Sequence, residues 1–480
     1  MLQHHQLYIG GEWVAPQGSD TITIVSPSTE EVLGTVPDAS EADVDRAVDA
    51  ARAAFDDPSG WSTWTPEARA EVLERFAAGL DNRAAATASA VSSQNGMPLQ
   101  ISQAFESVFP ALLLRYYSKL VTARGPEERR ESMFGGTTVV RREPIGVAAA
   151  IVPWNFPQAL AFLKIAPALA AGCTLVVKPA PETVLDSYVM AEAAIEAGLP
   201  PGVLNIVPAG REVGGYLVAH PLVDKVAFTG STAAGRSIAE TCGRLLRPVT
   251  LELGGKSAAI VLDDADLANN LEAFFGATLL NNGQTCFLGT RILAPRSRYE
   301  EIVDTITSLA SSLTIGDALD ASTQVGPMVS ARQRARVESY IAKGLSDGAR
   351  ITTGGGRPAG HDRGYFVAPT IFADVDNNHT IAQEEIFGPV LAVIPYGDEA
   401  EAVRIANDSD YGLGGSVWSA DPEHAAAVAR KVRTGSIGVN SYVNDPVSPF
   451  GGVKSSGLGR EMGPEGLAGY EVLKSIYQAP

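Results

Sequence analysis

The spacing of apolar residues changes along the first 147 residues. Short alternating segments at 7–37 (LYIGGEWV, TITIVSP and EVLGTVP) predict β-strands separated by turns. From Ser40, a typical helix N-cap residue, apolar residues recur at helical spacing, which predicts helices at 40–55, 66–94 and 100–121. The charged segment 124–136 contains Gly and Pro and predicts a connector, followed by a strand at 137–147 that passes between two lobes.

Residues 145–253 alternate between strand and helix patterns. Five apolar runs are shorter than an average helix: IGVAAAIVP, CTLVVKP, GVLNIV, DKVAFTG and PVTLELGG. Helical patterns lie between them at 158–171, 182–197, 211–219 and 232–242. This alternation is typical of a parallel sheet covered on both faces, whose ligands bind at the carboxyl ends of the strands.

The second half of the chain predicts another α/β lobe. Between 255 and 440, helical patterns at 266–280, 298–312, 331–346, 399–407 and 422–432 alternate with strand patterns. From Phe450 the chain is rich in glycine and ends in GYEVLKSIY, a predicted terminal strand. A length of 480 residues agrees with about three domains or large lobes at roughly 150 residues each.

Composition narrows the classes of protein. The net charge of −18 argues against nucleic acid or an anionic membrane as the main partner, because both attract basic surfaces. Three cysteines are too few for a disulfide framework and agree with a reducing cytosol, and the absence of CxxC and HxxxH predicts no metal site. The apolar stretch 159–177 contains Lys164, Pro167 and Gly172, so it predicts a buried helix and strand rather than a membrane span. With no signal peptide pattern at the N-terminus, we expect a cytoplasmic protein.

Polar and glycine-rich segments follow four of the five strands in the 145–253 block. They are PWNFP at 153–157, KP at 178–179, TGSTAAG at 229–235 and ELGGK at 252–256. The loop 230–235 opens a helix whose N-terminal amides favour an anion such as a pyrophosphate. Lys178 lies where dinucleotide folds usually meet the adenosine ribose. Each segment alone is more often a simple turn, but their repetition predicts a ligand site.

The three cysteines have different surroundings. Cys173 begins an apolar strand and is expected to be buried, and Cys242 follows a predicted helix. Cys286 lies in a polar, glycine-flanked stretch after a helix (NNGQTCFLGT), which suits a partly exposed thiol. Cys286 is therefore the candidate reactive cysteine.

Six motifs in order resemble the aldehyde dehydrogenase superfamily. They are PWNFP at 153–157, FTGSTAAG at 228–235, LELGGK at 251–256, GQTC at 283–286, EEIFGPV at 384–390 and PFGGVKSSGLGRE at 449–461. The resemblance covers nearly the whole chain from IGGEWV onward. It implies a cofactor-binding lobe (1–124 and 145–252), a catalytic lobe (253–445) and a small bridging β element that pairs subunits (125–144 and 464–480).

The resemblance also implies residue roles. Cys286 corresponds to the family nucleophile, Glu252 to its general base and Asn155 to its oxyanion donor, with Lys164 as a further catalytic residue. Lys178 corresponds to the adenosine-ribose contact, and Glu385 and Phe387 to the pair that holds the nicotinamide ribose. The full set of implied cofactor contacts is Ile151, Pro153, Trp154, Asn155, Lys178, Gly215, Phe228, Thr229, Gly230, Ser231, Leu253, Gly254, Glu385 and Phe387.

The implied reaction needs these residue types. A thiolate adds to the aldehyde, and the Asn155 side chain with the Cys286 backbone N–H stabilises the resulting alkoxide. Loss of hydride to NAD leaves a thioester, which water activated by Glu252 hydrolyses to the carboxylic acid. Because a free cysteine is only a few per cent ionised at neutral pH, activation of Cys286 by the site is expected.

The substrate is expected to be an apolar aliphatic or aromatic aldehyde. The predicted tunnel residues are all apolar: Phe156, Leu160, Leu163, Phe287 and Phe450. No Arg or Lys is placed to bind a carboxylate or phosphate of the substrate. Exposed strand edges at 137–144 and at the C-terminus predict a homo-oligomer, with a tetramer favoured over a dimer.

Two alternatives stay open at this point. One is a semialdehyde dehydrogenase that uses NADP. NAD is preferred here because no basic residue occurs from 179 to 190 and Glu182 is near Lys178, although Pro181 occupies the position at which NAD-preferring relatives often have Glu. The other is a catalytically silent structural member of the family, which would be expected to lack Cys286 or Glu252.

Overall fold

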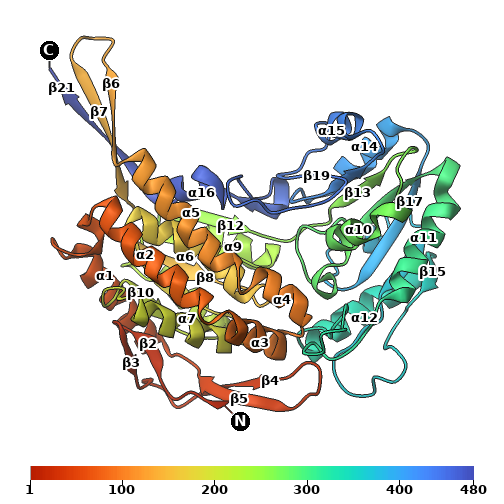
Figure 1. The fold of residues 1–480 in the computed structure, drawn as a ribbon, viewed down its shortest axis with the longest axis horizontal. Coiled ribbons are helices and arrows are strands. Elements are labelled where there is room, and N and C mark those ends of the chain that lie inside the picture. Colours follow the sequence, from red (N-terminus) through yellow and green to blue (C-terminus); the bar gives the residue numbers. More distant parts are fainter. Residues whose placement is uncertain (1, 480) are drawn as a thin grey trace.

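The computed structural model describes residues 2–479, which form two α/β lobes and a projecting β sheet (Figure 1). The first lobe contains an eight-stranded sheet in the order β20-β12-β11-β8-β9-β10-β2-β3. The strands are β2 (Leu7–Ile9), β3 (Glu12–Val14), β8 (Val147–Ile151), β9 (Thr174–Lys178), β10 (Leu204–Ile206), β11 (Lys225–Thr229), β12 (Val249–Glu252) and β20 (Gly457–Leu458). The five central strands are parallel and fully or largely buried, which confirms the prediction for 145–253.

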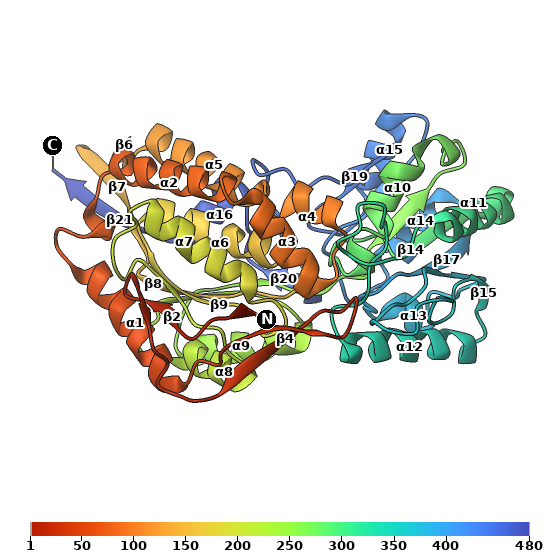
Figure 2. The ribbon, with the colours of Figure 1, turned by 60° about the horizontal axis from the view of Figure 1, so that its bottom comes forward.

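Helices cover both faces of this sheet (Figure 2). One face carries α6 (Pro157–Ala171) and α7 (Leu185–Glu196), with α2 (Pro66–Asp81), α3 (Ala84–Asn95), α4 (Leu99–Phe105) and α5 (Phe109–Arg124) outside them. The other face carries α1 (Glu41–Asp56), α8 (Arg211–Ala219) and α9 (Thr232–Arg244). Ser40 caps α1 through a capping box with Asp43, as its sequence suggests.

Two predicted helices are each broken in two. The predicted helix 66–94 is interrupted at Asn82 and Arg83, where Arg83 leaves helical geometry and pairs with Glu196 of α7. The predicted helix 100–121 is interrupted at 106–108, because Pro110 favours a new helix start and Glu106 turns toward α6. Pro110 is a local signal, but the contacts of Arg83 with α7 and of Glu106 with α6 are long-range, and a local periodicity does not contain them.

The second lobe contains a seven-stranded sheet in the order β15-β16-β17-β14-β13-β18-β19. Its strands are β13 (Ala258–Val261), β14 (Arg291–Pro295), β15 (Arg350–Thr353), β16 (Thr370–Ala373), β17 (Val390–Tyr396), β18 (Ser416–Trp418) and β19 (Gly438–Val439), and only β15 pairs antiparallel. The helices are α10 (Leu271–Thr278), α11 (Tyr299–Ser312), α12 (Ala331–Ser346), α13 (Thr380–Gln383), α14 (Glu399–Asn407) and α15 (Pro422–Ala429). The fold class is therefore α/β with two lobes, as predicted.

Two smaller sheets complete the fold. Strands β1 (Leu2–Gln3), β4 (Thr21–Val25) and β5 (Val32–Pro37) form one. Strands β6 (Glu127–Glu131), β7 (Thr137–Pro144) and β21 (Glu471–Gln478) form the other, which projects beyond the first lobe next to the short helix α16 (Gly463–Ala468) (Figure 1). The prediction of a plain connector at 124–136 was wrong for β6, whose charged residues are all exposed and so lack an apolar alternation. Within residues 2–479, no helix is long and apolar enough to cross a membrane.

Candidate active site

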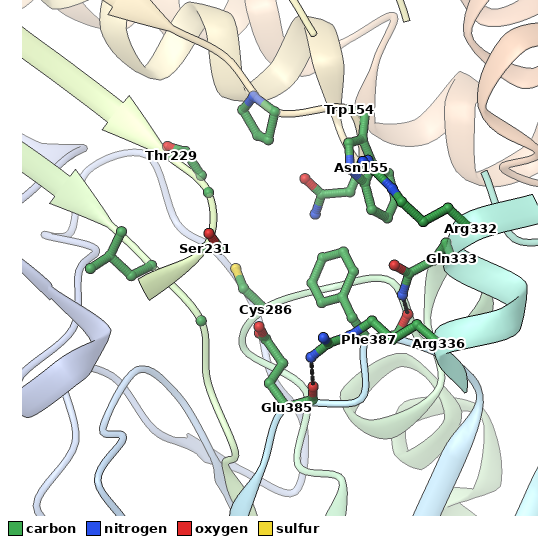
Figure 3. Close-up of a pocket in the computed structure, with 14 residues that line it drawn as sticks. Trp154, Asn155, Thr229, Ser231, Cys286, Arg332, Gln333, Arg336, Glu385 and Phe387 are labelled. Carbon is green, nitrogen blue, oxygen red and sulfur yellow. Dashed lines mark hydrogen bonds between the residues drawn. The ribbon is translucent and has the colours of Figure 1, made fainter. Parts of the chain in front are cut away.

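The site lies where the strand order of the first sheet reverses. β9 and β10 follow on one side of β8, whereas β11 and β12 lie on its other side. The segments after β8 and β11 therefore diverge and leave a crevice at the carboxyl edge, which is the usual ligand position in such folds. The second lobe closes this crevice with Cys286, the N-terminal turns of α12 and the loop that holds Glu385 (Figure 3).

Two adjoining cavities occupy the crevice. The inner cavity, of about 370 Å³, is lined by Pro153, Trp154, Asn155, Thr229, Gly230, Ser231, Leu253, Gly254, Cys286, Arg332, Gln333, Arg336, Glu385 and Phe387. The outer cavity, of about 450 Å³, is lined by residues including Ile151, Lys178, Pro181, Glu182, Arg211, Gly214, Gly215, Phe228 and Ile238. The walls shared by both cavities include Pro153, Trp154, Thr229, Gly230, Ser231 and Arg332. The structure thus brings all fourteen predicted cofactor contacts to one continuous crevice.

Cys286 is held by a tightly packed turn after α10. Asn281, Asn282 and Gly283 all have positive φ, and a β-carbon on Gly283 would lie 2.2 Å from the Gly388 carbonyl oxygen. A β-carbon on Gly255 would lie 2.4 Å from the Cys286 carbonyl oxygen. Only glycine fits at these two positions, so the polar GQTC segment is fixed by close backbone packing.

The environment of Cys286 does not favour the thiolate. Burial in the crevice raises the pKa of its thiol far above the ordinary value, and the nearby carboxylates of Glu385 and Glu252 raise it further. The expectation of an activated thiolate is therefore not met by these surroundings, and the thiol needs a base to lose its proton. Cys173 and Cys242 are both buried, and Cys242 lies within the last turn of α9 rather than after it.

Glu252 ends strand β12 and lines neither cavity, but its charge is close enough to Cys286 to raise the pKa of that thiol. Both of its carboxylate oxygens are buried and have no hydrogen-bond partner among the described residues. Burial raises its pKa well above the usual range, and the charge of Glu461 adds to the effect. A β-carbon on Gly451 would lie 2.5 Å from Glu252 Oε1, so a larger residue there would displace the carboxylate.

Lys164 does not line either cavity but lies beneath them. Its Nζ donates to Thr229 Oγ1 at 2.6 Å and to Glu461 Oε1 at 2.8 Å. The Lys164–Glu461 ion pair is almost completely buried. Its positive charge favours the ionised form of Glu252, opposing the effect of burial on the pKa of Glu252.

Asn155 projects into the inner cavity near Cys286 (Figure 3). Its Nδ2 donates to the Gln284 carbonyl at 3.0 Å. The Asn155 carbonyl accepts hydrogen bonds from Asn281 Nδ2 at 2.9 Å and from Asn95 Nδ2 at 3.2 Å. Both the backbone and the amide of Asn155 are thereby fixed relative to the cysteine turn.

Lys178 and the N-terminus of α9 provide positive potential along the outer cavity. Burial lowers the pKa of Lys178 to about 8, and its Nζ donates to the carbonyls of Pro179 and Ala209. Ser231 caps α9, and the adjacent backbone amides of this helix face the shared wall. A β-carbon on Gly230 would lie 2.5 Å from the Phe228 ring, so a larger residue there would displace that ring.

Helix α12 supplies three wall residues that the sequence reasoning missed: Arg332, Gln333 and Arg336. Gln333 Nε2 donates to the Phe387 carbonyl at 2.7 Å, and Arg336 Nη2 donates to the Glu385 carbonyl at 2.6 Å (Figure 3). Glu385 in turn accepts from the Gly255 backbone N–H at 3.0 Å. These contacts join residues at 255, 333–336 and 385–387, and short motifs do not reveal such a long-range arrangement.

The five predicted tunnel residues line neither cavity. Phe287, Leu163 and Phe450 are buried in an apolar cluster against which Cys286, Leu160 and Tyr442 pack. Phe156 and Leu160 belong to or pack against a second cluster. The Phe287 and Tyr442 rings stack with centroids 4.3 Å apart. Cys286 thus packs against an apolar cluster as well as lining the inner cavity.

Comparisons with known proteins identify the family of the chain. The model of the aldehyde dehydrogenase family matches residues 13–476. A geranial dehydrogenase from Castellaniella defragrans is 56% identical over 476 residues, which cover 99% of both chains. The crystal structure of a Mycobacterium tuberculosis aldehyde dehydrogenase complexed with NAD⁺ is 48% identical, with a TM-score of 0.97 over 99% of this chain and 98% of that one. A mutant of aldehyde dehydrogenase C from Pseudomonas syringae, complexed with NAD⁺ and octanal, is 41% identical, with a TM-score of 0.94 over 98% of this chain and 96% of that one.

The chain therefore belongs to the aldehyde dehydrogenase family. It is an NAD-dependent enzyme that oxidises an aldehyde. The crevice fits an elongated dinucleotide, because two joined cavities lie along it. Lys178 at a strand end suits a ribose, and the N-terminus of α9 with the close-packed Gly230 loop suits a pyrophosphate.

Proposed function

We propose that Cys286 is the nucleophile and that the Asn155 amide, with the Cys286 backbone N–H, binds the oxygen of the tetrahedral intermediate. The proposal is supported by the common orientation of Cys286 and Asn155 toward the inner cavity (Figure 3). A preorganised donor of this kind contributes about 2.7–4 kcal/mol to transition-state stabilisation. The Sγ–carbon bond forms as the aldehyde C=O π bond becomes an alkoxide, and loss of hydride then converts this thiohemiacetal to a thioester.

Glu252 acts as the general base. A carboxylate with a raised pKa accepts a proton more readily than an ordinary one, and the charge of Glu252 acts on a thiol whose own pKa is raised. It takes the proton of Cys286 before addition, passes that proton to solvent, and then takes a proton from water during thioester hydrolysis. Lys164 and Glu461 maintain a buried polar network beneath Glu252, so we assign Lys164 a positioning role rather than direct contact with the substrate.

The cofactor, when bound, supplies the hydride acceptor. In the proposed arrangement Lys178 contacts the adenosine ribose, the 229–231 loop binds the pyrophosphate, and Glu385 with Phe387 binds the nicotinamide ribose. Gln333 and Arg336 hold the backbone of that last pair. The remaining predicted contacts complete the walls between these points.

We propose that the physiological substrate is an apolar aldehyde of terpenoid or medium-chain aliphatic type. The apolar cluster against which Cys286 packs carries this proposal, together with a second apolar cluster that Leu160 also contacts. The geranial dehydrogenase relative, and the structure of a relative with octanal, support the same class. An NADP-dependent semialdehyde dehydrogenase is the less favoured candidate, because a second carboxylate has no evident cationic partner in those clusters.

A panel of aldehydes tests the substrate class. With saturating NAD, we expect kcat/KM for geranial and octanal to exceed that for succinic semialdehyde by at least 100-fold. Leu160→Glu should reduce turnover of octanal by more than tenfold, because it places a charge beside the apolar clusters, whereas Leu246→Glu at an exposed site should not. A preference for the semialdehyde would refute the assignment.

We further propose that the β6-β7-β21 sheet is the bridging element of a homotetramer, built as a dimer of dimers. In this proposal the bridging element comprises residues 125–144 and 464–480. The cofactor-binding lobe comprises residues 1–124 and 145–252, and the catalytic lobe comprises residues 253–445. The free cysteines support a reducing compartment, which we propose is the cytoplasm.

A further inference from the structure

An ion pair spans the outer cavity between the two lobes. Arg332 is in the first turn of α12, and Glu182 lies in the loop after β9. Arg332 Nη2 and Glu182 Oε1 are 3.0 Å apart, and both residues line the outer cavity. The Arg332 side chain is 84% exposed and also lines the inner cavity, whereas that of Glu182 is 24% exposed.

Other charges in the outer cavity are distributed unevenly. Lys178 is buried at the base, and its Nζ is already engaged by two carbonyl oxygens. Arg211 lines the same cavity, and Asp38 and Glu182 are the anions close enough to affect Lys178. Glu182 is therefore the carboxylate that lines this cavity, and Arg332 is the cation that it neutralises.

We propose that Glu182 and Arg332 form a specificity-determining pair for the cofactor, in which Glu182 excludes a 2′-phosphate and keeps Arg332 from binding it. This inference rests on the proposed placement of the adenosine ribose beside Lys178. A 2′-phosphate next to Lys178 meets the Glu182 carboxylate, which repels it. Without that carboxylate, the Arg332 guanidinium has no anionic partner in the cavity and is available to pair with the phosphate.

The pair takes the place of the usual discriminator. Pro181 offers neither a charge nor an N–H at the position where NAD-preferring relatives often have Glu. Glu182, one residue later, is held toward the cavity by a residue of the opposite lobe. The selectivity between NAD and NADP at the adenosine subsite thus depends on one residue from each lobe, Glu182 and Arg332.

Binding of reduced cofactors tests the proposal without turnover. Quenching of tryptophan fluorescence by NADH and NADPH, at low and at high salt, gives both dissociation constants, because Trp154 lines the inner cavity. We expect Glu182→Gln to tighten NADPH binding at least fivefold at low salt and to change NADH binding by less than twofold. Added salt should reduce that gain, since Arg332 is exposed.

A double variant identifies the residue that receives the phosphate. Adding Arg332→Gln to Glu182→Gln should abolish the gain for NADPH. Arg334→Gln is the matched control, because Arg334 lies on the same helix, pairs with Glu338 and lines neither cavity. The pair is not the determinant if Glu182→Gln leaves the NADPH constant unchanged, or if the double variant keeps the full gain.

Lys178→Met separates this inference from the placement on which it rests. If the adenosine ribose binds at Lys178, the substitution weakens NADH binding several-fold in a protein whose circular dichroism is unchanged. Unchanged NADH binding in that variant would overturn the placement itself. If Lys178→Met weakens NADH binding but Glu182→Gln leaves the dissociation constant of NADPH unchanged, the placement of the ribose holds and the Glu182–Arg332 proposal alone is overturned.

Discussion

At the scale of single residues, Cys286 combines two properties that oppose each other. It is partly exposed on the wall of the inner cavity, as the sequence suggests, yet its desolvation and two nearby carboxylates raise the pKa of the thiol and favour the protonated form. Burial also raises the pKa of Glu252, whose oxygens have no partner among the described side chains and backbone groups. Burial thus weakens the nucleophile while it strengthens the base, and the two residues operate as a unit.

Substitution of each cysteine tests which thiol reacts. Cys286→Ser should abolish dehydrogenase activity, because a serine hydroxyl is far less acidic than a thiol. Cys173→Ser and Cys242→Ser serve as controls and should retain most of the activity, since both residues are buried outside the crevice. Steady-state assays and iodoacetamide labelling of the three variants measure this. Near-normal turnover by Cys286→Ser is incompatible with the proposed nucleophile.

The pH dependence of kcat/KM reports on Glu252. Only its ionised form accepts a proton, and burial raises its pKa above the usual carboxyl range. Activity should therefore rise with pH through a limb that lies above that range, and it should be low at pH 5. Glu252→Gln should lose this limb and most of the rate. A wild-type profile that is flat from pH 5 to pH 9 would exclude Glu252 as the base.

Much of this constellation follows from motifs, but its electrostatics do not. The GQTC, LELGG and PWNFP segments locate Cys286, Glu252 and Asn155 because tight backbone packing constrains their neighbours, such as Gly255 and Gly283. The direction of a pKa shift depends on residues that pack from other elements. For that reason the sequence suggests an activated thiol, whereas burial and the charges of Glu385 and Glu252 raise the pKa of that thiol in the structure.

At the scale of elements, helix α6 connects a buried acid cluster to the active site. Glu106 Oε2 accepts from the backbone N–H groups of Gln158 and Ala159, in the first turn after Phe156. Glu106 is fully buried next to Asp186, and burial raises its pKa from 4.5 to about 8. Glu106 therefore caps the helix that starts directly after the oxyanion segment.

Stability measurements should reveal this buried acid. Because the folded-state pKa of Glu106 is raised, its contribution to stability is present at low pH and is lost as pH rises through about 8. Between pH 5 and pH 9, wild type should lose on the order of 3 kcal/mol more unfolding free energy than Glu106→Gln does. Urea titrations of both proteins measure the difference.

Glu67→Gln provides the control for this experiment. Glu67 is an exposed acid in the first turn of α2, so its substitution should leave the pH dependence of wild type unchanged. Parallel pH profiles for wild type and Glu106→Gln would contradict the burial argument. The cap lies at the break in the predicted helix 100–121, where Glu106 follows α4 and accepts from α6.

At the scale of the whole molecule, the projecting sheet has too little core of its own. Strand β6 is exposed along its length, and β21 is exposed over most of its length. At the tip of the β6–β7 turn, Met133 and Phe134 are 99% and 98% exposed. Alternation of apolar and polar residues predicted β7 and β21, but β6 was missed because both of its faces are polar in the single subunit.

Light scattering tests whether other subunits cover this sheet. We expect a tetrameric mass at micromolar concentration, since exposed edges and apolar tips are usually covered. Joint substitution of Met133 and Phe134 by Ser should reduce the assembly to dimers or monomers. Leu246→Ser, at a site that is 92% exposed outside the sheet, should not. A monomeric wild-type protein would rule out the proposed role of the sheet.

The central claim is that Cys286 carries the acyl group between hydride loss and hydrolysis. Mass spectrometry of wild type and Glu252→Gln, acid-quenched during the first turnover with NAD and octanal, tests it most directly. The account predicts an octanoyl group on the peptide that contains Cys286, at higher occupancy in Glu252→Gln wherever that variant still forms NADH. Formation of NADH with no acyl group on Cys286 in either protein, or with the group on another residue, would contradict it.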